Sequence, residues 1–221
     1  MKNRDKSSGY YPIFLNIRGK RCLVVGGGEV ALRKVKTLLE HGADVEVVSL
    51  KFCPELNKLT REGKIKSSAK AYNSTHLKGA LIAIAATDDA DINERISSDA
   101  RKQGVLVNVV DVPEHSDFIV PSTLTRGDIA IAVSTSGKSP ALARKIRTEL
   151  ESKFGDEYAK LAETVSAIRI QLKQEGIILA NEAWQEILEL DMLAKLLRQD
   201  KFQEAKDTML NKLRKLGPKK P

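Results

Sequence analysis

The sequence contains few of the residues that build disulfide frameworks, zinc sites or nucleic-acid platforms. Only two of its 221 residues are cysteines and three are histidines, so we expect no disulfide framework and no protein-only metal site. Aromatic residues make up 5% of the chain, which is few for stacking nucleic-acid bases. No stretch approaches the roughly 18 apolar residues that a membrane span requires. We therefore expect neither a nucleic-acid nor a membrane partner.

The amino-terminal residues also lack the apolar core of a secretion signal. They read MKNRDKSSGYYPIF, a polar start that predicts a cytoplasmic protein.

The chain has an excess of positive charge. Its 37 Lys and Arg residues outnumber its 29 Asp and Glu residues and give a net charge of +8. Such an excess is compatible with an ordinary solvated surface or with a partner rich in carboxylates or phosphates.

Apolar strands and amphipathic helices alternate along the first half of the chain. Strands are expected in the segments RCLVVGG, ADVEVVSL, GALIAIAATDD and GVLVNVVDVP, with helices over 29–41 and 89–103. Such an alternation predicts an α/β fold with a Rossmann-like, doubly wound parallel sheet. After Pro113 the pattern changes to two strands joined at TRGD, expected to be antiparallel. From Ser139 onward it becomes helical, with breaks at Gly155 and Gly176.

The first strand runs into the glycine-rich segment GGGEVA. Gly26, Gly28 and Ala31 match G-x-G-x-x-A, in which the glycines permit a tight turn and a close approach of the backbone to a pyrophosphate. The helix that follows offers free N–H groups and a partial positive charge to phosphates. Because a strand precedes the motif and a helix follows it, the segment predicts a dinucleotide-binding site.

The end of the second strand lacks the acidic residue that usually binds the ribose 2′-hydroxyl. Ser49, Leu50 and Lys51 occupy this position. One interpretation is NADP, with Lys51 contacting a 2′-phosphate. The other is NAD, held through backbone groups and Ser49. The motif by itself leaves both open.

Two further strand ends carry carboxylates, at the edge where ligands of such sheets bind. Thr87, Asp88 and Asp89 follow one apolar strand, and for Asp89 we favour a helix cap or turn. Asp111 follows the next apolar strand, where partial burial could tune a carboxylate for proton transfer or metal contact.

The segment TSGKSP begins the long helical region. Ser139 is expected to cap the helix, with Pro140 at its first position. The alternative is a functional one, in which Thr135, Ser136, Gly137 and the helix amides bind a carboxylate or phosphate of the substrate.

Taken in order, the motifs GGGEVA, AATDD, NVVDVP and TSGKSP resemble those of the precorrin-2 dehydrogenases of siroheme biosynthesis, a module that also forms the amino-terminal part of siroheme synthases. The resemblance implies oxidation of precorrin-2, a tetrapyrrole with eight carboxylates, to sirohydrochlorin with NAD⁺. It also implies a homodimer. It divides the chain into an NAD-binding Rossmann domain over 1–113, a dimerisation segment over 114–147 and a helical domain over 148–221.

The resemblance also assigns residues. Asp111 matches the acid–base or metal-handling aspartate, and Gly26, Gly28, Glu29, Val30, Leu50 and Lys51 match NAD contacts. Family members likewise lack the ribose carboxylate and use NAD. Together with positions at the strand ends, the predicted cofactor contacts are Gly26, Gly27, Gly28, Glu29, Val30, Ser49, Leu50, Lys51, Thr87 and Asp88. The predicted substrate contacts are Asn108, Thr135, Ser136, Gly137 and Ser139.

Two alternative functions remain. Some family members also insert Fe²⁺ into sirohydrochlorin, and the motifs do not separate these bifunctional enzymes from pure dehydrogenases. A different class is a dinucleotide-sensing regulatory domain without catalysis. In that case AATDD and NVVD would have no stated role.

Overall fold

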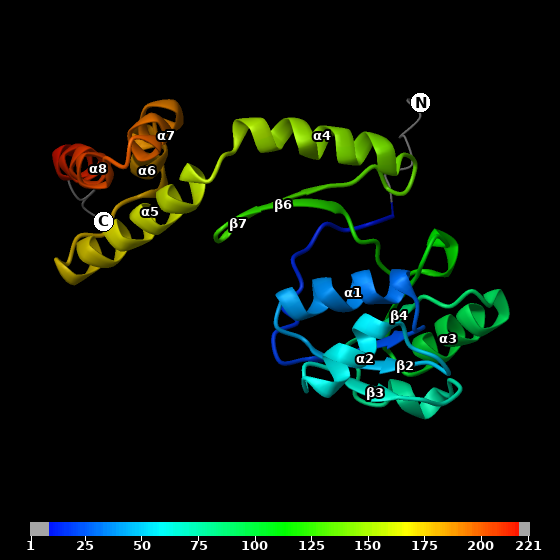
Figure 1. Ribbon diagram of the computed structural model, residues 1–221. Coiled ribbons are helices and arrows are strands. Elements are labelled where there is room, and N and C mark those ends of the chain that lie inside the picture. Colours follow the sequence, from blue (N-terminus) through cyan, green and yellow to red (C-terminus); the bar gives the residue numbers. More distant parts are fainter. Residues whose placement is uncertain (1–8, 217–221) are drawn as a thin grey trace. The chain divides into compact units, whose positions relative to one another are not determined.

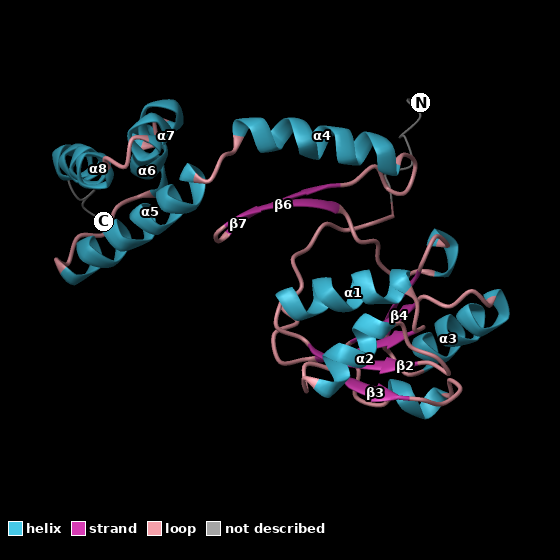
Figure 2. Cartoon of the chain, in the orientation of Figure 1, coloured by secondary structure: helices cyan, strands magenta, loops and turns pink. Residues whose placement is uncertain are grey.

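The computed structural model describes residues 9–216, which divide after Val120 into two compact units. The first unit contains a parallel sheet with helices on both faces, and the second contains a hairpin and five helices among the described residues. Figure 1 labels most of these elements, and Figure 2 separates helices from strands by colour.

The first unit is a five-stranded parallel sheet in the order β3-β2-β1-β4-β5. The strands are β1 (Arg21–Val25), β2 (Asp44–Val48), β3 (Lys66–Ser68), β4 (Ile82–Ala85) and β5 (Leu106–Val109). The helices are α1 (Glu29–Glu40), α2 (Pro54–Arg61) and α3 (Ala90–Lys102), with single 3-10 turns η1 (Ser74–Leu77) and η2 (Pro113–His115). The predicted Rossmann-like α/β fold is confirmed, and β1 lies centrally with its glycine loop at the carboxyl edge.

Each face of this sheet is covered by different helices. On one face, Val24 of β1 and Ile84 of β4 pack with Val35 of α1 and with Leu56 of α2. On the other face, residues such as Leu23 of β1 pack with side chains of α3. Because successive side chains of a strand point to opposite faces, the continuous apolar runs of the sequence bury residues on both sides.

The second unit begins with an antiparallel hairpin of β6 (Ser122–Arg126) and β7 (Ile129–Val133). Its helices are α4 (Pro140–Lys153), α5 (Glu157–Gln174), α6 (Asn181–Ile187), α7 (Leu190–Arg198) and α8 (Phe202–Leu216). The expected antiparallel pair and the breaks near Gly155 and Gly176 are confirmed. Two further breaks, after Ile187 and after Arg198, were not predicted because no glycine or proline marks them.

The helices from α5 to α8 share one apolar core, with Ile168, Leu193 and Met209 fully buried. A charged pair borders it. Glu157 is 8% exposed, and its Oε1 accepts hydrogen bonds from Arg198 Nε at 2.8 Å and Nη2 at 2.5 Å. Burial is the largest influence and opposes the charged carboxylate. The hydrogen bonds from Arg198, a backbone hydrogen bond and the charges of Arg198 and Arg126 together outweigh it and lower the pKa of Glu157.

Replacing Arg198 with alanine should therefore destabilise the helical unit, because it leaves the Glu157 carboxylate buried without its partner. Since the folded pKa of Glu157 is lowered, the stabilisation is present above the ordinary carboxyl pKa and disappears as the pH falls through the folded value. Urea unfolding at neutral and acidic pH measures both effects. Lys160→Ala, which removes an exposed pair with Asp200, is the control and should shift the midpoint less. An equal shift for both variants, or a pH-independent one for Arg198→Ala, contradicts the expectation.

Within residues 9–216, no helix combines the length and the apolar character that crossing a membrane would require.

Candidate functional site

The glycine loop is held against the sheet by contacts that leave no room for side chains. Gly26 has φ of +133° and a Cβ there would lie 2.2 Å from the carbonyl oxygen of Ala86. A Cβ on Gly27 would lie 1.8 Å from the carbonyl oxygen of Lys51. The amide of Cys53 donates to the carbonyl of Gly27 at 2.8 Å. Both glycines are therefore required by the packing of the loop itself.

Gly28 differs from its two neighbours. It has φ of −90° and ψ of −171°, and a Cβ there would meet nothing within 4 Å. It precedes Glu29 and Val30, the first residues of α1, and no side chain caps this helix. The first amides of α1 thus lie beside an open surface. This arrangement suits a pyrophosphate, which approaches the backbone closely and accepts hydrogen bonds from helix amides.

The end of β2 forms a small turn of its own. The hydroxyl of Ser49 donates to the carbonyl of Lys51 at 2.8 Å. Leu50 is 72% exposed, and Lys51 is also exposed. An apolar side chain and an ammonium group are therefore available next to the glycine loop, while the Ser49 hydroxyl is already engaged.

Hydrogen bonds connect the residues after β4 to helix α3. The hydroxyl of Thr87 lies 2.8 Å from Oδ1 of Asn93, whose amide donates to the Thr87 carbonyl at 2.9 Å. Asp89 Oδ1 accepts a hydrogen bond from the amide of Ile92 at 3.0 Å. The favoured interpretation of Asp89 as a helix cap is confirmed, and Asp88 is exposed beside it.

Asp111 follows β5 in a turn with φ of +61°. The sequence interpretation expected partial burial, but the structure has this side chain exposed. The physical reason is the left-handed turn, in which the amide of Val112 donates to the carbonyl of Val109 at 3.2 Å and the chain leaves the sheet at once. Aspartate is one of the few residues that adopt this conformation readily.

The loop after Asp111 folds back along β5 and holds the turn in place. The Ser116 hydroxyl accepts from the amide of Val109 at 2.9 Å and lies 3.0 Å from the carbonyl of Val112. The Asp117 carboxylate accepts from the amide of Val107 at 3.1 Å. Sequence reasoning missed both residues. The only available signal was two short polar side chains soon after Pro113, at the start of a loop.

Asn108 of β5 also contacts the loop that follows Asp111. It is 8% exposed, and its Nδ2 donates to the carbonyl of Phe118 at 3.0 Å. Its amide thus secures the returning loop, and this structural bond accounts for one of its donors.

Lys34 of α1 was also missed by the sequence analysis. The pKa of Lys34 is lowered, mainly because the side chain is partly buried and also because the charge of Arg33 lies nearby. The carboxylate of Asp111 acts in the opposite direction and raises this pKa. Asp111 is therefore close enough for its charge to act on the Lys34 ammonium. Only the folded chain brings α1 and the end of β5 together.

A third feature near the glycine loop is a cluster of Glu29, Cys53 and Glu55, whose possible ligand atoms all lie within 4.8 Å of one another. Both carboxylates are exposed and stand in the first turns of α1 and α2, where they stabilise the helix dipoles. That placement explains the cluster without a metal.

Both cysteines are free, and burial raises the pKa of Cys22 to about 11.

The TSGKSP segment lies in the second unit. Ser139 Oγ accepts from the amide of Leu142 at 3.2 Å, so the predicted cap is confirmed. Thr135 Oγ1 accepts from the amide of Ser139 at 2.9 Å. Ser136 and Gly137 both have positive φ, at 55° and 81°. Of the five predicted substrate contacts, only Asn108 lies in the first unit with the glycine loop.

The parallel sheet and its open glycine loop define an NAD(P)-binding protein of Rossmann type. Residues 13–122 match the family model described as putative NAD(P)-binding, and residues 126–153 match the one described as sirohaem biosynthesis protein central. The chain belongs to the family of siroheme biosynthesis proteins that combine these two segments.

Siroheme synthases are among its curated relatives. The chain is 43% identical to that of Nitrosococcus oceani over 182 residues, covering 81% of this chain and 39% of the relative. Against Methylobacillus flagellatus the identity is 45%, covering 74% and 35% respectively. For Nitrosomonas eutropha it is 40%, covering 92% and 43%. The chain thus spans about two fifths of the length of these relatives.

A solved structure shares the fold. The chain resembles "SirC, precorrin-2 dehydrogenase" with a TM-score of 0.70 and 24% sequence identity, covering 93% of this chain and all of that one. The likeness extends over the sheet, the hairpin and the helical region.

Proposed function

We propose that the protein oxidises precorrin-2 to sirohydrochlorin with NAD⁺ as the hydride acceptor. The observation that carries this proposal is the uncapped start of α1 at Gly28, on the same sheet edge as the exposed carboxylate of Asp111. The choice of precorrin-2 as the substrate rests on the motif resemblance and on the siroheme synthase relatives. A dinucleotide site holds the hydride acceptor, and a carboxylate at the same sheet edge can accept the proton that a dehydrogenation releases.

The residues of the chain have distinct roles in this reaction. The amides at the start of α1 bind the pyrophosphate and so orient the nicotinamide end of the cofactor. When bound, NAD⁺ supplies the two-electron oxidising power. Precorrin-2 loses one hydride and one proton in forming sirohydrochlorin, and Asp111 accepts the proton.

We propose NAD rather than NADP as the cofactor. Leu50, 72% exposed at the end of β2, offers an apolar surface to the adenosine. The family that the motifs resemble also uses NAD without a ribose carboxylate. Because Lys51 is exposed and could instead meet a 2′-phosphate, the affinities for both dinucleotides need to be compared. Tighter binding of NADP would overturn this choice.

The second unit is proposed to bind the carboxylates of the substrate. The turn from Thr135 to Ser139 precedes α4, and Lys138, Arg144 and Lys145 add positive charge around it. A tetrapyrrole with eight carboxylates matches this charge. Asn108 is also proposed to contact the substrate, using the part of its amide that does not bind Phe118.

We also propose that the protein is a homodimer in the cytoplasm. The β6–β7 hairpin is a sheet of only two strands, and such a sheet is marginal unless further strands or a partner cover it. Helix α4 contacts it, yet Leu142 of α4 is 51% exposed. Two free cysteines suit a reducing compartment. Light scattering measures the dimer directly, and a monomer at all concentrations contradicts it.

The direct test supplies the purified protein with precorrin-2 and NAD⁺ under exclusion of oxygen and records the sirohydrochlorin spectrum. We expect formation to depend on NAD⁺ and to match the NADH produced. Reactions without protein or with NADP⁺ are the controls. If NAD⁺ binds but no product forms, the proposal fails and the alternative of a dinucleotide-sensing domain takes its place.

A further inference from the structure

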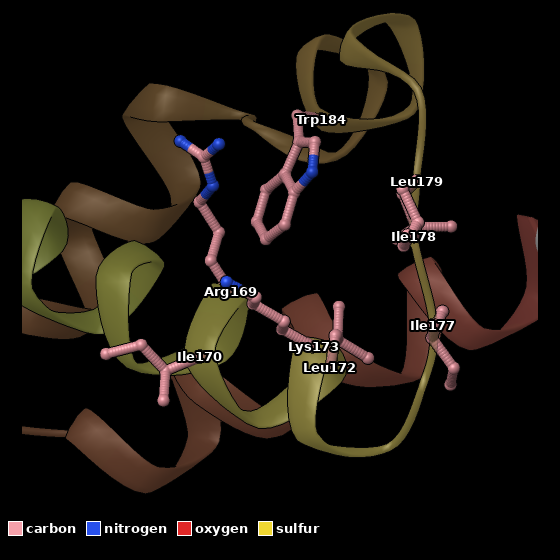
Figure 3. A pocket seen from close by; sticks show the side chains of 8 residues that line it. All are labelled: Arg169, Ile170, Leu172, Lys173, Ile177, Ile178, Leu179 and Trp184. Carbon is pink, nitrogen blue, oxygen red and sulfur yellow. The ribbon is translucent and has the colours of Figure 1, made fainter.

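The helical unit contains a pocket outside the glycine loop, the strand-end motifs and the TSGKSP segment. It has a volume of about 350 Å³ and is lined by Arg169, Ile170, Leu172, Lys173, Ile177, Ile178, Leu179 and Trp184. Helix α5 forms one wall, the segment after Gly176 forms another, and Trp184 of α6 closes one end (Figure 3). We propose that this pocket binds a small carboxylic acid with a compact apolar body.

The apolar part of the pocket continues the core of the unit. Leu172 is 2% exposed, and Ile177, Leu179 and Trp184 pack against the same core. In contrast, Ile178 is 81% exposed at the rim. Large aliphatic side chains left in water around an opening gain free energy when an apolar ligand covers them.

All charged side chains that line the pocket are positively charged. Arg169 and Lys173 are the charged residues in its lining, one helical turn apart on α5. Neither forms an ion pair with another described residue. The Arg169 guanidinium lies 5.8 Å from the centre of the Trp184 ring. Figure 3 draws both side chains as sticks. Stacking of this kind leaves the in-plane N–H groups of arginine free to bind a carboxylate.

Size and charge together define the ligand. Small-molecule sites range from about 300 to 1,000 Å³ and combine an apolar lining with few polar groups. This pocket lies at the small end, so it holds a ligand of roughly ten to fifteen non-hydrogen atoms rather than a whole tetrapyrrole. The two cations select a carboxylate over a neutral group. The inference does not depend on the proposed dehydrogenase function.

Octanoate is a suitable probe, because it carries one carboxylate on an apolar chain and does not absorb where tryptophan is excited. Trp184 is the only tryptophan in the chain, so its emission reports on this pocket alone. We expect octanoate to change that emission with saturation at a dissociation constant on the order of 1 mM. Octanamide, its neutral counterpart, should bind about tenfold more weakly.

Matched variants separate the charge from the fold. Arg169→Gln and Lys173→Gln should each weaken octanoate binding about fivefold to tenfold while leaving octanamide binding unchanged. Lys195→Gln removes an exposed lysine on α7 outside the pocket and should bind octanoate normally. Ile178→Asp, at an 81% exposed position, should preserve helicity by circular dichroism and abolish octanoate binding.

Three results would overturn the inference. They are the absence of a saturable change in Trp184 emission, equal binding of octanoate and octanamide, and normal octanoate binding by folded Arg169→Gln and Lys173→Gln proteins. Dehydrogenase activity of the same preparations is measured separately, so that failure of one proposal is not mistaken for failure of the other.

Discussion

Replacing Gly28 with alanine should weaken NAD binding about 10- to 100-fold without unfolding the protein. The backbone angles of Gly28 suit any residue, and its Cβ would meet nothing within 4 Å. The new methyl group would therefore fit the free protein. It would, however, occupy the surface over the amides of α1 that the pyrophosphate has to approach. Calorimetric titration measures the affinity, and thermal unfolding checks the fold.

Two other glycines serve as controls for this prediction. Gly27→Ala should lower both the melting temperature and NAD binding, because its Cβ would lie 1.8 Å from the Lys51 carbonyl oxygen. Gly9→Ala should change neither, since a Cβ at Gly9 also meets nothing within 4 Å and the residue stands outside the motif. If Gly28→Ala binds NAD normally, the pyrophosphate does not lie over this residue and the site has to be revised.

Replacing Asp111 with asparagine should reduce dehydrogenase turnover by at least about 100-fold, the lower end of what a general base contributes. Asparagine keeps the size of the side chain and tolerates the positive φ of 61° at this position. Alanine would strain the turn and so confuse a loss of the base with a loss of structure. The affinity for NAD should stay unchanged, because Asp111 stands two strands away from β1 in the sheet.

Glu114→Gln is the control for Asp111, since Glu114 is an exposed carboxylate in η2 only three residues further on. It should retain full turnover. The measurement is the rate of sirohydrochlorin formation at saturating NAD⁺. Normal turnover by Asp111→Asn would show that orientation by the cofactor site is sufficient, and Asp111 would then no longer be the proton acceptor.

The sequence predicted the parts of the site that depend on local chain geometry. The glycine loop, the helix caps at Asp89 and Ser139, and the β6–β7 hairpin all lie where the residue patterns placed them. Each of these features is determined by neighbours within a few residues along the chain. The breaks before α7 and α8 were missed, because packing against the other helices decides where those helices end.

The burial and the partners of the candidate base could not be predicted in this way. The apolar strand before Asp111 indicated partial burial, yet the left-handed turn exposes it. Ser116 and Asp117 secure that turn through hydrogen bonds to β5. Lys34 reaches its vicinity from a helix 77 positions earlier in the chain. None of these contacts follows a fixed spacing.

The sequence by itself determined the alternation of strands and helices in the first unit and the glycine loop, because periodicity and backbone preferences act over short distances along the chain. Only the tertiary structure decided which side chains from the strand ends and from α1 lie near one another at the carboxyl edge of the sheet. It also placed Arg169, Lys173 and Trp184 around one pocket. Contacts of this kind depend on how helices pack over strands and over one another, which residue spacing does not encode.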